Sequence, residues 1–420
     1  KISLCRRTSL PPLQGGIKGG RAIPLSVSHT TFSDFDLQVM ALALKLARRS
    51  EGLVEPNPMV GCVIVTDGQI IGQGFHRRFG GPHAEIEALR SCTSSPAGAT
   101  VYCTLEPCAH HGKTPPCTDA LIEAGVSRVV IPQLDPNPAV NGRGVRALRR
   151  AGIEVHVGAL ADAGVTLLRP FTTRVRSGRP YVIAKWAQSL DGRLVVPSGV
   201  PCPSPGSSGA GIPNRVHGGA SLGHATQWIS GEASRRRVHQ LRARVDAIMV
   251  GAGTVLRDDP LLTARDVPLR RSAMRWVVDG RLRIPVSSQL VKTAGQFATV
   301  VFTTTHASQS RKAEALRRAG VEVMPCRARR GLIALDDLLR STMFAGVTNL
   351  LVEGGPTLLN QLFHGNLVDE AHFYVAPRLL GLSSKEVEVI SFGEKAPTAI
   401  STERSGDDTL YTLLYSATSP

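Results

Sequence analysis

The sequence reads GPHAE at residues 81–85 and LEPCAHHGKTPPC at residues 105–117. These two stretches supply one imidazole, two thiols and one carboxylate. Imidazole and thiolate are preferred ligands of zinc, and three protein ligands leave the fourth position of a tetrahedral ion open to water. A carboxylate that is not needed as a ligand can carry protons to and from that water. The pattern therefore predicts a catalytic Zn²⁺ site with His83, Cys108 and Cys117 as ligands and Glu85 as the acid–base residue.

The order H-x-E, then P-C, then C is the signature of zinc-dependent nucleobase deaminases, in which the two cysteines commonly form C-x-x-C. Here eight residues separate Cys108 from Cys117, so the second thiolate must return to the metal from a longer loop. We expect water activated at the zinc to attack an amidine-like ring carbon while Glu85 carries its proton to the leaving amine. The alternative is a closed structural zinc site, in which His110 or His111 is the fourth ligand.

The composition describes a globular protein of two domains. The chain has 420 residues, a hydrophobic content of 42% and a mean hydropathy of +0.01. A chain of this length is too long to fold around a single hydrophobic core of ordinary size, and no apolar run is long enough to span a bilayer. Eight cysteines are too few for a disulfide scaffold, so we expect a reducing compartment and metal-bound thiols. We interpret six cysteines as small core residues: Cys5, Cys62, Cys92, Cys103, Cys202 and Cys326.

The formal net charge of +16 raises the question of acidic partners. Residues 1–31 contribute five basic residues and no acidic one, and they are rich in Ser, Thr, Gly and Pro. This composition predicts a plastid transit peptide or a disordered arm. If the segment is not a transit peptide, we expect the protein to be cytoplasmic. Aromatic residues make up only 5%, without the interleaving of a nucleic-acid platform. We therefore expect a phosphorylated small-molecule substrate, no nucleic acid and no membrane. Two alternatives remain open: nucleic-acid editing, and a zinc-stabilised binding module without turnover.

Periodicity predicts an α/β domain of three layers (α-β-α) over residues 32–170. Ser33 and Asp36 form a capping-box-like start to its first helix. Expected strands and helices then alternate. The strands are Met59–Val65, Gln69–Phe75, Thr100–Leu105, Arg128–Ile131 and Glu154–Val157, and the later helices are His83–Leu89, Thr118–Ala124 and Val145–Ala151.

After a linker at Thr173–Pro180, a second α/β domain is expected over residues 178–420. Residues 197–225 are dominated by Pro, Gly and Ser and read as a flexible surface insertion. Strands are predicted at Tyr181–Ala187, Ala247–Val250, Arg275–Val278, Thr299–Thr303, Asn349–Val352 and Ala371–Val375, with helices near 231–241, 307–319 and 335–343.

The first domain resembles the deaminase half of the bifunctional riboflavin-biosynthesis deaminase/reductases. The resemblance is carried by NPMVG (57–61), GFH (74–76), GPHAE (81–85), LEPCAHHGKTPPC (105–117) and DPNP (135–138). It implies a cytidine-deaminase-like fold. It also implies a diaminopyrimidinone substrate that bears a ribosylamino 5′-phosphate and loses its 2-amino group as ammonia. By this resemblance four residues would face the substrate: Asn57, His76, His110 and Lys113.

The second domain resembles the reductase half of the same family. The similar stretches are KWAQSLDG (185–192), TQWI (226–229), GAGTVLRDDPLLTAR (251–265) and VEGGPTL (352–358). The resemblance implies a dihydrofolate-reductase-like fold and NADPH-dependent hydride transfer to C1′ of the ribosylamino group. Lys185 and Asp258 would lie near the reacting carbon. The substrate would contact Thr226, Arg242, Leu262, Arg265 and Glu353, and NADPH would contact Ala187, Trp228, Thr254, Asp258, Gly355, Pro356 and Thr357.

Two features depart from the family pattern in the second domain. The insertion at 197–225 replaces a short link before the Gln227-Trp228 pair, and Thr226 stands where the family has serine. The alternative is therefore a deaminase whose reductase domain is only structural. Because the diagnostic residues of both halves are present, we favour a bifunctional enzyme, and we expect a homo-oligomer.

Overall fold

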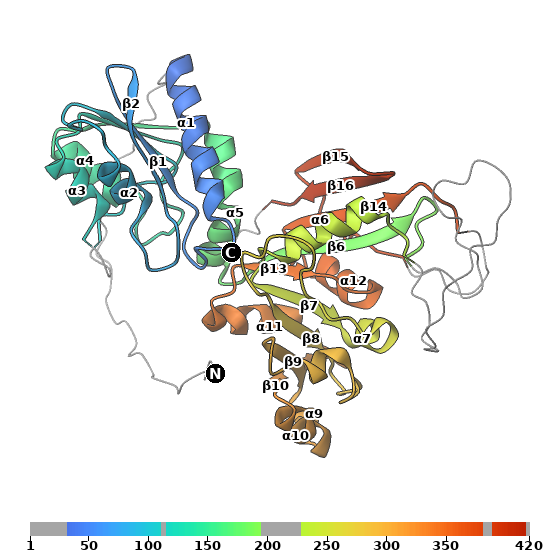
Figure 1. Cartoon of the computed structure of the whole chain (residues 1–420). Coiled ribbons are helices and arrows are strands. Elements are labelled where there is room, and N and C mark those ends of the chain that lie inside the picture. Colours follow the sequence, from blue (N-terminus) through green and yellow to red (C-terminus); the bar gives the residue numbers. More distant parts are fainter. Residues whose placement is uncertain (1–31, 111–114, 195–227, 381–388, 417–420) are drawn as a thin grey trace.

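The computed structural model of the chain describes residues 32–110, 115–194, 228–380 and 389–416 (Figure 1). The expected N-terminal arm and the 197–225 insertion lie outside these ranges, as do Lys113 and Thr226. Each half of the chain forms its own α/β unit, as the sequence predicts. None of the described helices has the length and apolarity needed to cross a membrane.

The first domain is built on a five-stranded sheet with the order β2-β1-β3-β4-β5. Strand β1 is antiparallel to β2 and β3, whereas β3, β4 and β5 are parallel. Helices α1 and α5 pack together on one side of the sheet, and α2, α3 and α4 form the layer on the other (Figure 1). The elements are α1 (Asp34–Ala47), η1 (Arg48–Ser50), β1 (Gly61–Thr66), β2 (Gln69–Phe75), α2 (Ala84–Arg90), β3 (Thr100–Cys103), α3 (Cys117–Glu123), β4 (Arg128–Ile131), α4 (Arg143–Arg150), β5 (Glu154–Val157) and α5 (Ala161–Ser177).

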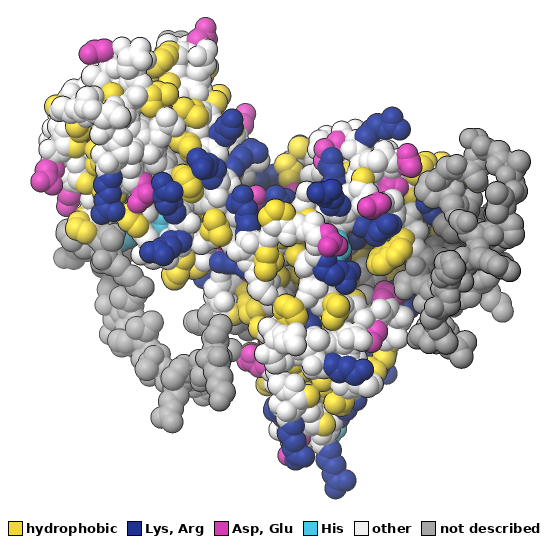
Figure 2. Space-filling model, viewed as in Figure 1, with side chains coloured by type: hydrophobic (Ala, Val, Ile, Leu, Met, Phe, Trp, Pro, Cys, Tyr) yellow, Lys and Arg dark blue, Asp and Glu magenta, His cyan; other side chains and the backbone are white. Residues whose placement is uncertain are grey.

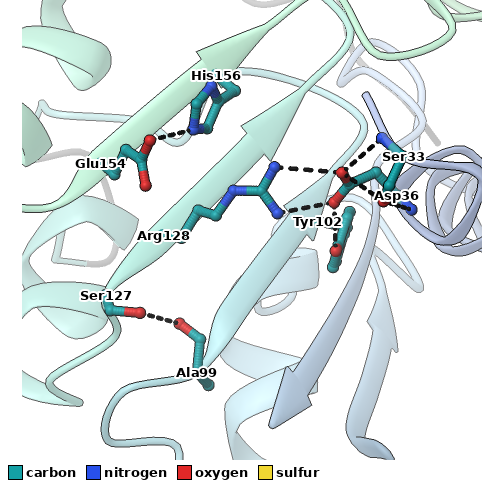
Figure 3. A network of polar contacts seen from close by, with 8 residues as sticks. All are labelled: Ser33, Asp36, Ala99, Tyr102, Ser127, Arg128, Glu154 and His156. Carbon is teal, nitrogen blue, oxygen red and sulfur yellow. Dashed lines mark hydrogen bonds and ion pairs between the residues drawn. The ribbon is translucent and has the colours of Figure 1, made fainter. Parts of the chain in front are cut away.

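Helix α1 is tied to the sheet by a buried carboxylate (Figure 3). The predicted capping box is confirmed, because Ser33 and Asp36 bond to each other's backbone N–H. The same Asp36 side chain accepts from the Tyr102 hydroxyl and from Arg128, each at 2.7 Å. One local cap therefore also joins α1 to β3 and β4.

The segment expected to be a linker is helical. Residues 173–177 form the last turns of α5, which ends at Gly178 in a left-handed conformation with φ 61°. The sequence did not predict this helix, because Pro170 lies inside it and Pro disfavours a helix interior. Packing of Leu167 and Leu168 into the core of the first domain outweighs that cost.

The second domain is built on a nine-stranded sheet with the order β10-β9-β8-β7-β13-β6-β14-β16-β15. The strands from β10 to β14 are parallel, and β16 and β15 are antiparallel additions at one edge. The elements are β6 (Tyr181–Ser189), α6 (Glu232–Arg242), β7 (Ala247–Gly251), α7 (Ala252–Asp258), β8 (Met274–Val278), α8 (Gln289–Lys292), β9 (Thr299–Thr304), α9 (Thr305–Ser308), α10 (Arg311–Arg318), β10 (Glu322–Cys326), β11 (Ala328–Arg329), β12 (Leu332–Ile333), α11 (Leu335–Ser341), η2 (Thr342–Ala345), β13 (Asn349–Val352), α12 (Pro356–His364), β14 (Glu370–Ala376), β15 (Ala399–Ser405) and β16 (Asp408–Leu414).

The helix predicted at 307–319 is two helices. Ser310 accepts a hydrogen bond from the Ala313 N–H and so caps a new helix, α10, after the short α9. Serine side chains favour N-caps over helix interiors, and this local preference divides the segment. The sequence also missed α7, α8, β10 and the β15–β16 hairpin. Every strand that it predicted in this domain is present, within two residues at each end.

Candidate active sites

The first site is a cluster of three ligand atoms. The Nδ1 atom of His83 lies 3.3 Å from Cys117 Sγ and 3.5 Å from Cys108 Sγ, and the three atoms lie within 4.8 Å of one another. In a tetrahedral zinc site, bond lengths of about 2.0 Å to nitrogen and 2.3 Å to sulfur place N and S ligands roughly 3.5 Å apart. The donor set and its spacing therefore fit zinc. Among the described residues no other His, Cys, Asp or Glu joins the cluster.

Local structure aims these side chains at one point. His83 is the N-cap residue of α2, yet its side chain makes no capping bond and instead faces the thiols. Cys117 is the first residue of α3, and its backbone N–H donates to Cys108 Sγ at 3.3 Å. Thr118 donates to the Cys108 carbonyl from both its backbone and its hydroxyl, at 3.2 Å each. The long loop between the cysteines is thus closed where it returns to the site.

Glu85 lies beside this cluster without being one of its ligands. It occupies the first turn of α2 and is only 3% exposed. Burial raises the pKa of Glu85 to about 6, and the neighbouring Cys108 adds to that rise. The contact with the Cys117 thiol pulls the pKa in the opposite direction. A carboxyl group with these properties can both take up and release a proton near neutral pH.

A second histidine, His76, lies next to the ligand His83, with 5.5 Å between the two ring centroids. His76 is 2% exposed, and its Nδ1 lies 2.9 Å from the Pro82 carbonyl, directly before His83. Because a carbonyl can only accept, Nδ1 carries the proton, and Nε2 accepts from the Asn57 amide at 3.2 Å. Burial lowers the pKa of His76, which favours this neutral form. The expected substrate residues Asn57 and His76 are therefore brought together.

Of the other two expected substrate residues of this domain, only His110 lies within the described residues. Burial raises the pKa of Asp135, and the nearby, exposed His110 opposes that rise. No hydrogen bond links it to the ligand cluster in the described structure. It is not part of the three-residue metal group, which argues against its role as a fourth ligand.

Glu106, for which the sequence alone predicted no role, shapes the loop before Cys108. Its buried carboxylate accepts backbone N–H bonds at 2.9–3.1 Å from Asp135, Gly142 and Val145. It thereby takes the place of the side-chain cap that α4 lacks. Gly144 packs so closely that a Cβ there would lie 2.0 Å from the Pro107 carbonyl. Both roles depend on residues distant in sequence, so no local signal pointed to them.

The second site centres on a buried carboxylate between two cations. Glu353 accepts from Arg242 Nε at 2.6 Å and from its NH2 at 2.9 Å, and Lys185 Nζ lies 3.7 Å away. Burial alone would raise the pKa of Glu353, but the charges of Arg242 and Lys185 lower it to about 2. Burial lowers the pKa of Lys185, against the opposing effect of Glu353. The three expected residues form one charged unit.

Sheet topology explains this convergence. Glu353 directly follows β13, which lies between β6 and β7, and Lys185 lies in β6. Arg242, the last residue of α6, also donates to the Thr263 carbonyl at 3.3 Å. Leu262, the residue before Thr263, is buried and has a left-handed backbone with φ 52°. The backbone N–H of Arg265 donates to Nδ1 of His239 in α6 at 3.2 Å. The expected bidentate phosphate donor Arg242 therefore already has carboxylate and carbonyl acceptors.

The expected NADPH residues lie at the carboxyl edge of the same sheet. Gly355 is the N-cap residue of α12, with Pro356 and Thr357 in its first turn, directly after β13. Thr254 lies in α7, which follows the adjacent strand β7. Free N–H groups at a helix start suit a phosphate, and the open end of parallel strands is the usual ligand edge.

Asp258, Ala187 and Trp228 are the remaining expected residues that the structure describes in this domain. Asp258 ends α7 and forms an ion pair with Arg257 at 3.5 Å, whereas Lys185 is paired with Glu353. Burial raises the pKa of Asp258. Ala187 faces Tyr374 across β6 and β14. Trp228 is 59% exposed, with the guanidinium of Arg235 5.5 Å from its ring.

Comparison with known families and proteins relates both halves to one kind of protein. The family described as "Cytidine and deoxycytidylate deaminase zinc-binding region" matches residues 33–133, and "RibD C-terminal domain" matches residues 218–409. The riboflavin biosynthesis protein RibD of Actinobacillus pleuropneumoniae is 41% identical over 346 residues, which cover 82% of this chain and 85% of that protein. The Escherichia coli RibD is 39% identical, with 83% and 90% covered.

Solved structures give the same relationship. The Acinetobacter baumannii RibD structure (form 1) superposes with a TM-score of 0.74 and 33% identity, covering 91% of this chain and 99% of that one. The Thermotoga maritima structure described as a diaminohydroxyphosphoribosylaminopyrimidine deaminase/5-amino-6-(5-phosphoribosylamino)uracil reductase has a TM-score of 0.72 and 32% identity, with the same coverage.

Proposed function

Because this chain belongs to the RibD family of riboflavin-biosynthesis proteins and combines a deaminase with a reductase domain, we propose that its two sites act in sequence on one phosphorylated pyrimidine. The first substrate is 2,5-diamino-6-ribosylamino-4(3H)-pyrimidinone 5′-phosphate. Its deaminated product is then reduced so that the ribosyl group becomes ribityl. The observation that carries the proposal is that the zinc cluster and the Lys185–Glu353–Arg242 unit are both complete in one chain.

In the deaminase, His83, Cys108 and Cys117 hold the zinc, which when bound makes water a better nucleophile and stabilises charge on the oxygen. Glu85 takes a proton from the attacking water and gives a proton to the departing 2-amino group. That group leaves as ammonia, and the water oxygen becomes the new ring carbonyl. Asn57 and the neutral His76 position the pyrimidine, and His110 and Lys113 also contact the substrate.

In the reductase, NADPH supplies the hydride that adds to C1′ of the ribosylamino group. Gly355, Pro356 and Thr357 bind it at the start of α12, together with Thr254, Ala187, Trp228 and Asp258. Lys185 donates the proton that the sugar ring oxygen gains as the C1′–oxygen bond breaks. Glu353 keeps Lys185 and Arg242 in place, as their shared contact supports. Thr226, Leu262 and Arg265 complete the substrate side.

Two further assignments complete this proposal. Residues 1–31 are a plastid transit peptide, as their basic, acid-free composition supports. A fusion of this segment to a fluorescent protein should then enter plastids. The enzyme is a homo-oligomer, supported by the exposed edge strand β15 with its 63% exposed Ile400. Sedimentation should give a mass above that of one 44.7 kDa chain.

The charge distribution favours a small substrate over nucleic acid. Figure 2 shows Lys and Arg side chains scattered over both domains, with acidic side chains between them, rather than a single basic band. A nucleic-acid-editing enzyme needs a groove for flanking nucleotides, and its reaction does not require a reductase domain. A salt-dependent shift of a nucleic-acid probe by this protein would revive that alternative.

The deciding experiment is a coupled assay on protein of measured zinc content. Ammonia release from the diaminopyrimidine substrate is measured first, and NADPH oxidation by its product second. We expect both activities in one preparation. Well-folded, zinc-loaded protein that releases ammonia but never oxidises NADPH would show that the second domain is only structural.

A further inference from the structure

A loop of the first domain is held by arginines of the second. Arg270 NH1 donates to the backbone carbonyls of Arg49 and Glu51, at 3.0 and 3.1 Å. Arg244 NH1 binds the Glu51 carboxylate at 3.0 Å. The partners in each of these bonds are more than 190 residues apart in sequence, as between Arg244 and Glu51, which are separated by 193.

A third arginine extends the contact along the loop. Arg271 NH2 donates to the Glu55 carbonyl at 3.4 Å, and its NH1 lies 3.7 Å from the Glu55 carboxylate. Burial raises the pKa of Glu55, and the charge of Arg271 opposes that rise. We call Arg244, Arg270 and Arg271 the arginine clamp, and residues 49–58 the clamped loop.

The clamp is itself anchored in the second domain. The backbone N–H groups of Arg270 and Arg271 both donate to the Ala243 carbonyl, at 3.1 and 3.0 Å, at the end of α6. Arg271 also forms an ion pair with Asp246, whose carboxylate accepts from the Asn349 N–H at 2.7 Å at the start of β13. The guanidinium groups therefore project from a fixed base.

The two backbones also touch directly. Gly52 has a φ of 77°, and a Cβ at this position would lie 3.0 Å from the Arg244 carbonyl oxygen and 3.1 Å from its Cα. Such a contact with backbone atoms cannot be relieved by a rotamer change. An alanine here would push the clamped loop and Arg244 apart by a few tenths of an ångström, in addition to the strain of a positive φ.

The clamped loop leads into the zinc site. Asn57 donates its N–H to the Val54 carbonyl at 2.9 Å, and its side-chain amide meets His76 at 3.2 Å. His76 in turn donates to the Pro82 carbonyl at 2.9 Å, one residue before the ligand His83. The segment between them is fastened to the same loop, because the Phe79 N–H donates to the Leu53 carbonyl at 3.2 Å.

We propose that the reductase domain positions the deaminase site through the arginine clamp, which holds the clamped loop so that Asn57 meets His76 beside the zinc ligands. The clamp residues are positioning residues that act through Asn57. The inference rests on the proposed deaminase function of the first domain. It makes deamination depend on docking of the second domain even though hydride chemistry occurs elsewhere.

The first test compares two alanine substitutions. Gly52→Ala introduces a methyl group against Arg244, whereas Gly68→Ala, in the β1–β2 turn, carries the same backbone strain with φ 74° but meets nothing within 4 Å. Relative to Gly68→Ala, we expect Gly52→Ala to lower kcat/KM for ammonia release by about tenfold, mainly through KM, because binding geometry is disturbed. Zinc content and NADPH oxidation with pre-formed deaminated substrate should stay unchanged. A kcat/KM within about twofold of the control overturns the proposal.

The second test exchanges the charges of one clamp pair. Glu51→Arg and Arg244→Glu should each lower kcat/KM for ammonia release by about fivefold, as a partly exposed pair allows. The double variant should recover most of that loss, because the ion pair is restored with its sign reversed. Failure of the double variant to recover, in protein with full zinc and full NADPH oxidation, contradicts a role of the pair in positioning.

Amide hydrogen exchange separates this inference from the proposed function. In Gly52→Ala, residues 53–58 and 76–83 should exchange faster than in Gly68→Ala, whether or not either protein releases ammonia. If the unaltered protein releases no ammonia, the proposed function fails, and exchange still tests the clamp. Unchanged protection of both segments overturns the clamp, whatever the activity.

Discussion

Arg242 and Glu353 form a bidentate ion pair, with both hydrogen bonds between 2.6 and 2.9 Å and with both side chains at most 15% exposed. The carboxylate also lies 3.7 Å from Lys185, so one anion is shared by two cations. Removing a partner from a buried pair leaves uncompensated charge, which is far more disruptive than loss of a surface pair. This arrangement decides how the reductase site should respond to substitution.

Glu353→Gln should lower NADPH oxidation by about 100-fold, because Lys185 and Arg242 then repel each other without a shared anion. Ammonia release should be unchanged, since the group formed by His83, Cys108 and Cys117 lies in the first domain. Glu403→Gln is the matched control, because it breaks an arginine pair of similar length at a surface where Glu403 is 55% exposed. If the two variants oxidise NADPH at the same rate, Glu353 has no part in the reductase mechanism.

Glu85→Gln should lower ammonia release by about 10²- to 10⁴-fold, the usual contribution of a general acid–base residue. Zinc content should be unchanged, because Glu85 is not one of the three clustered ligands. Glu87→Gln serves as the control, since Glu87 lies two residues further along α2 and pairs with Arg77 at the surface. A Glu85→Gln variant with normal turnover would favour a binding module over a deaminase.

Removal of zinc by a chelator should abolish ammonia release and leave NADPH oxidation with deaminated substrate largely intact. The two sites belong to separate domains, each with its own sheet and its own hydrophobic core. Cys117→Ser should behave like the chelated enzyme, whereas Cys326→Ser, in β10 of the second domain, should retain both metal and activity. Metal analysis beside both assays distinguishes these outcomes, and retained deamination by zinc-free protein would refute a catalytic metal.

Asp36→Asn should reduce the free energy of unfolding by about 3 kcal/mol, because it breaks a buried ion pair with Arg128. Burial raises the pKa of Asp36, but hydrogen bonds from Arg128, Tyr102 and Ser33 outweigh it and hold the pKa well below the usual 3.8. A depressed folded-state pKa stabilises the protein above pH 3.8, and this contribution is lost as the pH falls below that value.

Urea unfolding of the first domain at several pH values checks this expectation. The difference between the original protein and Asp36→Asn should be constant near neutral pH and shrink in acid. Asp34→Asn, at an exposed position two residues earlier in α1, should cost little at any pH. If the difference in the free energy of unfolding instead grows towards acid pH, the pKa of Asp36 is raised in the folded protein rather than lowered.

Much of the first domain could be predicted because its signals are local. The capping box at Ser33 and Asp36, the alternating strands and the motif around His83 each depend on spacing within a few residues. The second domain was harder to predict. Its buried parallel strands could be recognised in the sequence, but α7 and the β15–β16 hairpin could not. Strand β15 is mostly exposed and lacks the apolar alternation that marks a half-buried strand.

By itself the sequence determined the fold class and the order of the two domains, and it predicted the zinc ligands and the proton-carrying acid from residue chemistry and spacing. Only the tertiary structure decided that Glu106 caps α4, that Arg242 shares Glu353 with Lys185, and that three arginines of one domain hold the loop of Asn57 in the other. Each of these contacts joins segments between 36 and more than 200 residues apart. Such contacts depend on how distant segments of the chain pack against one another, so no local sequence pattern records them.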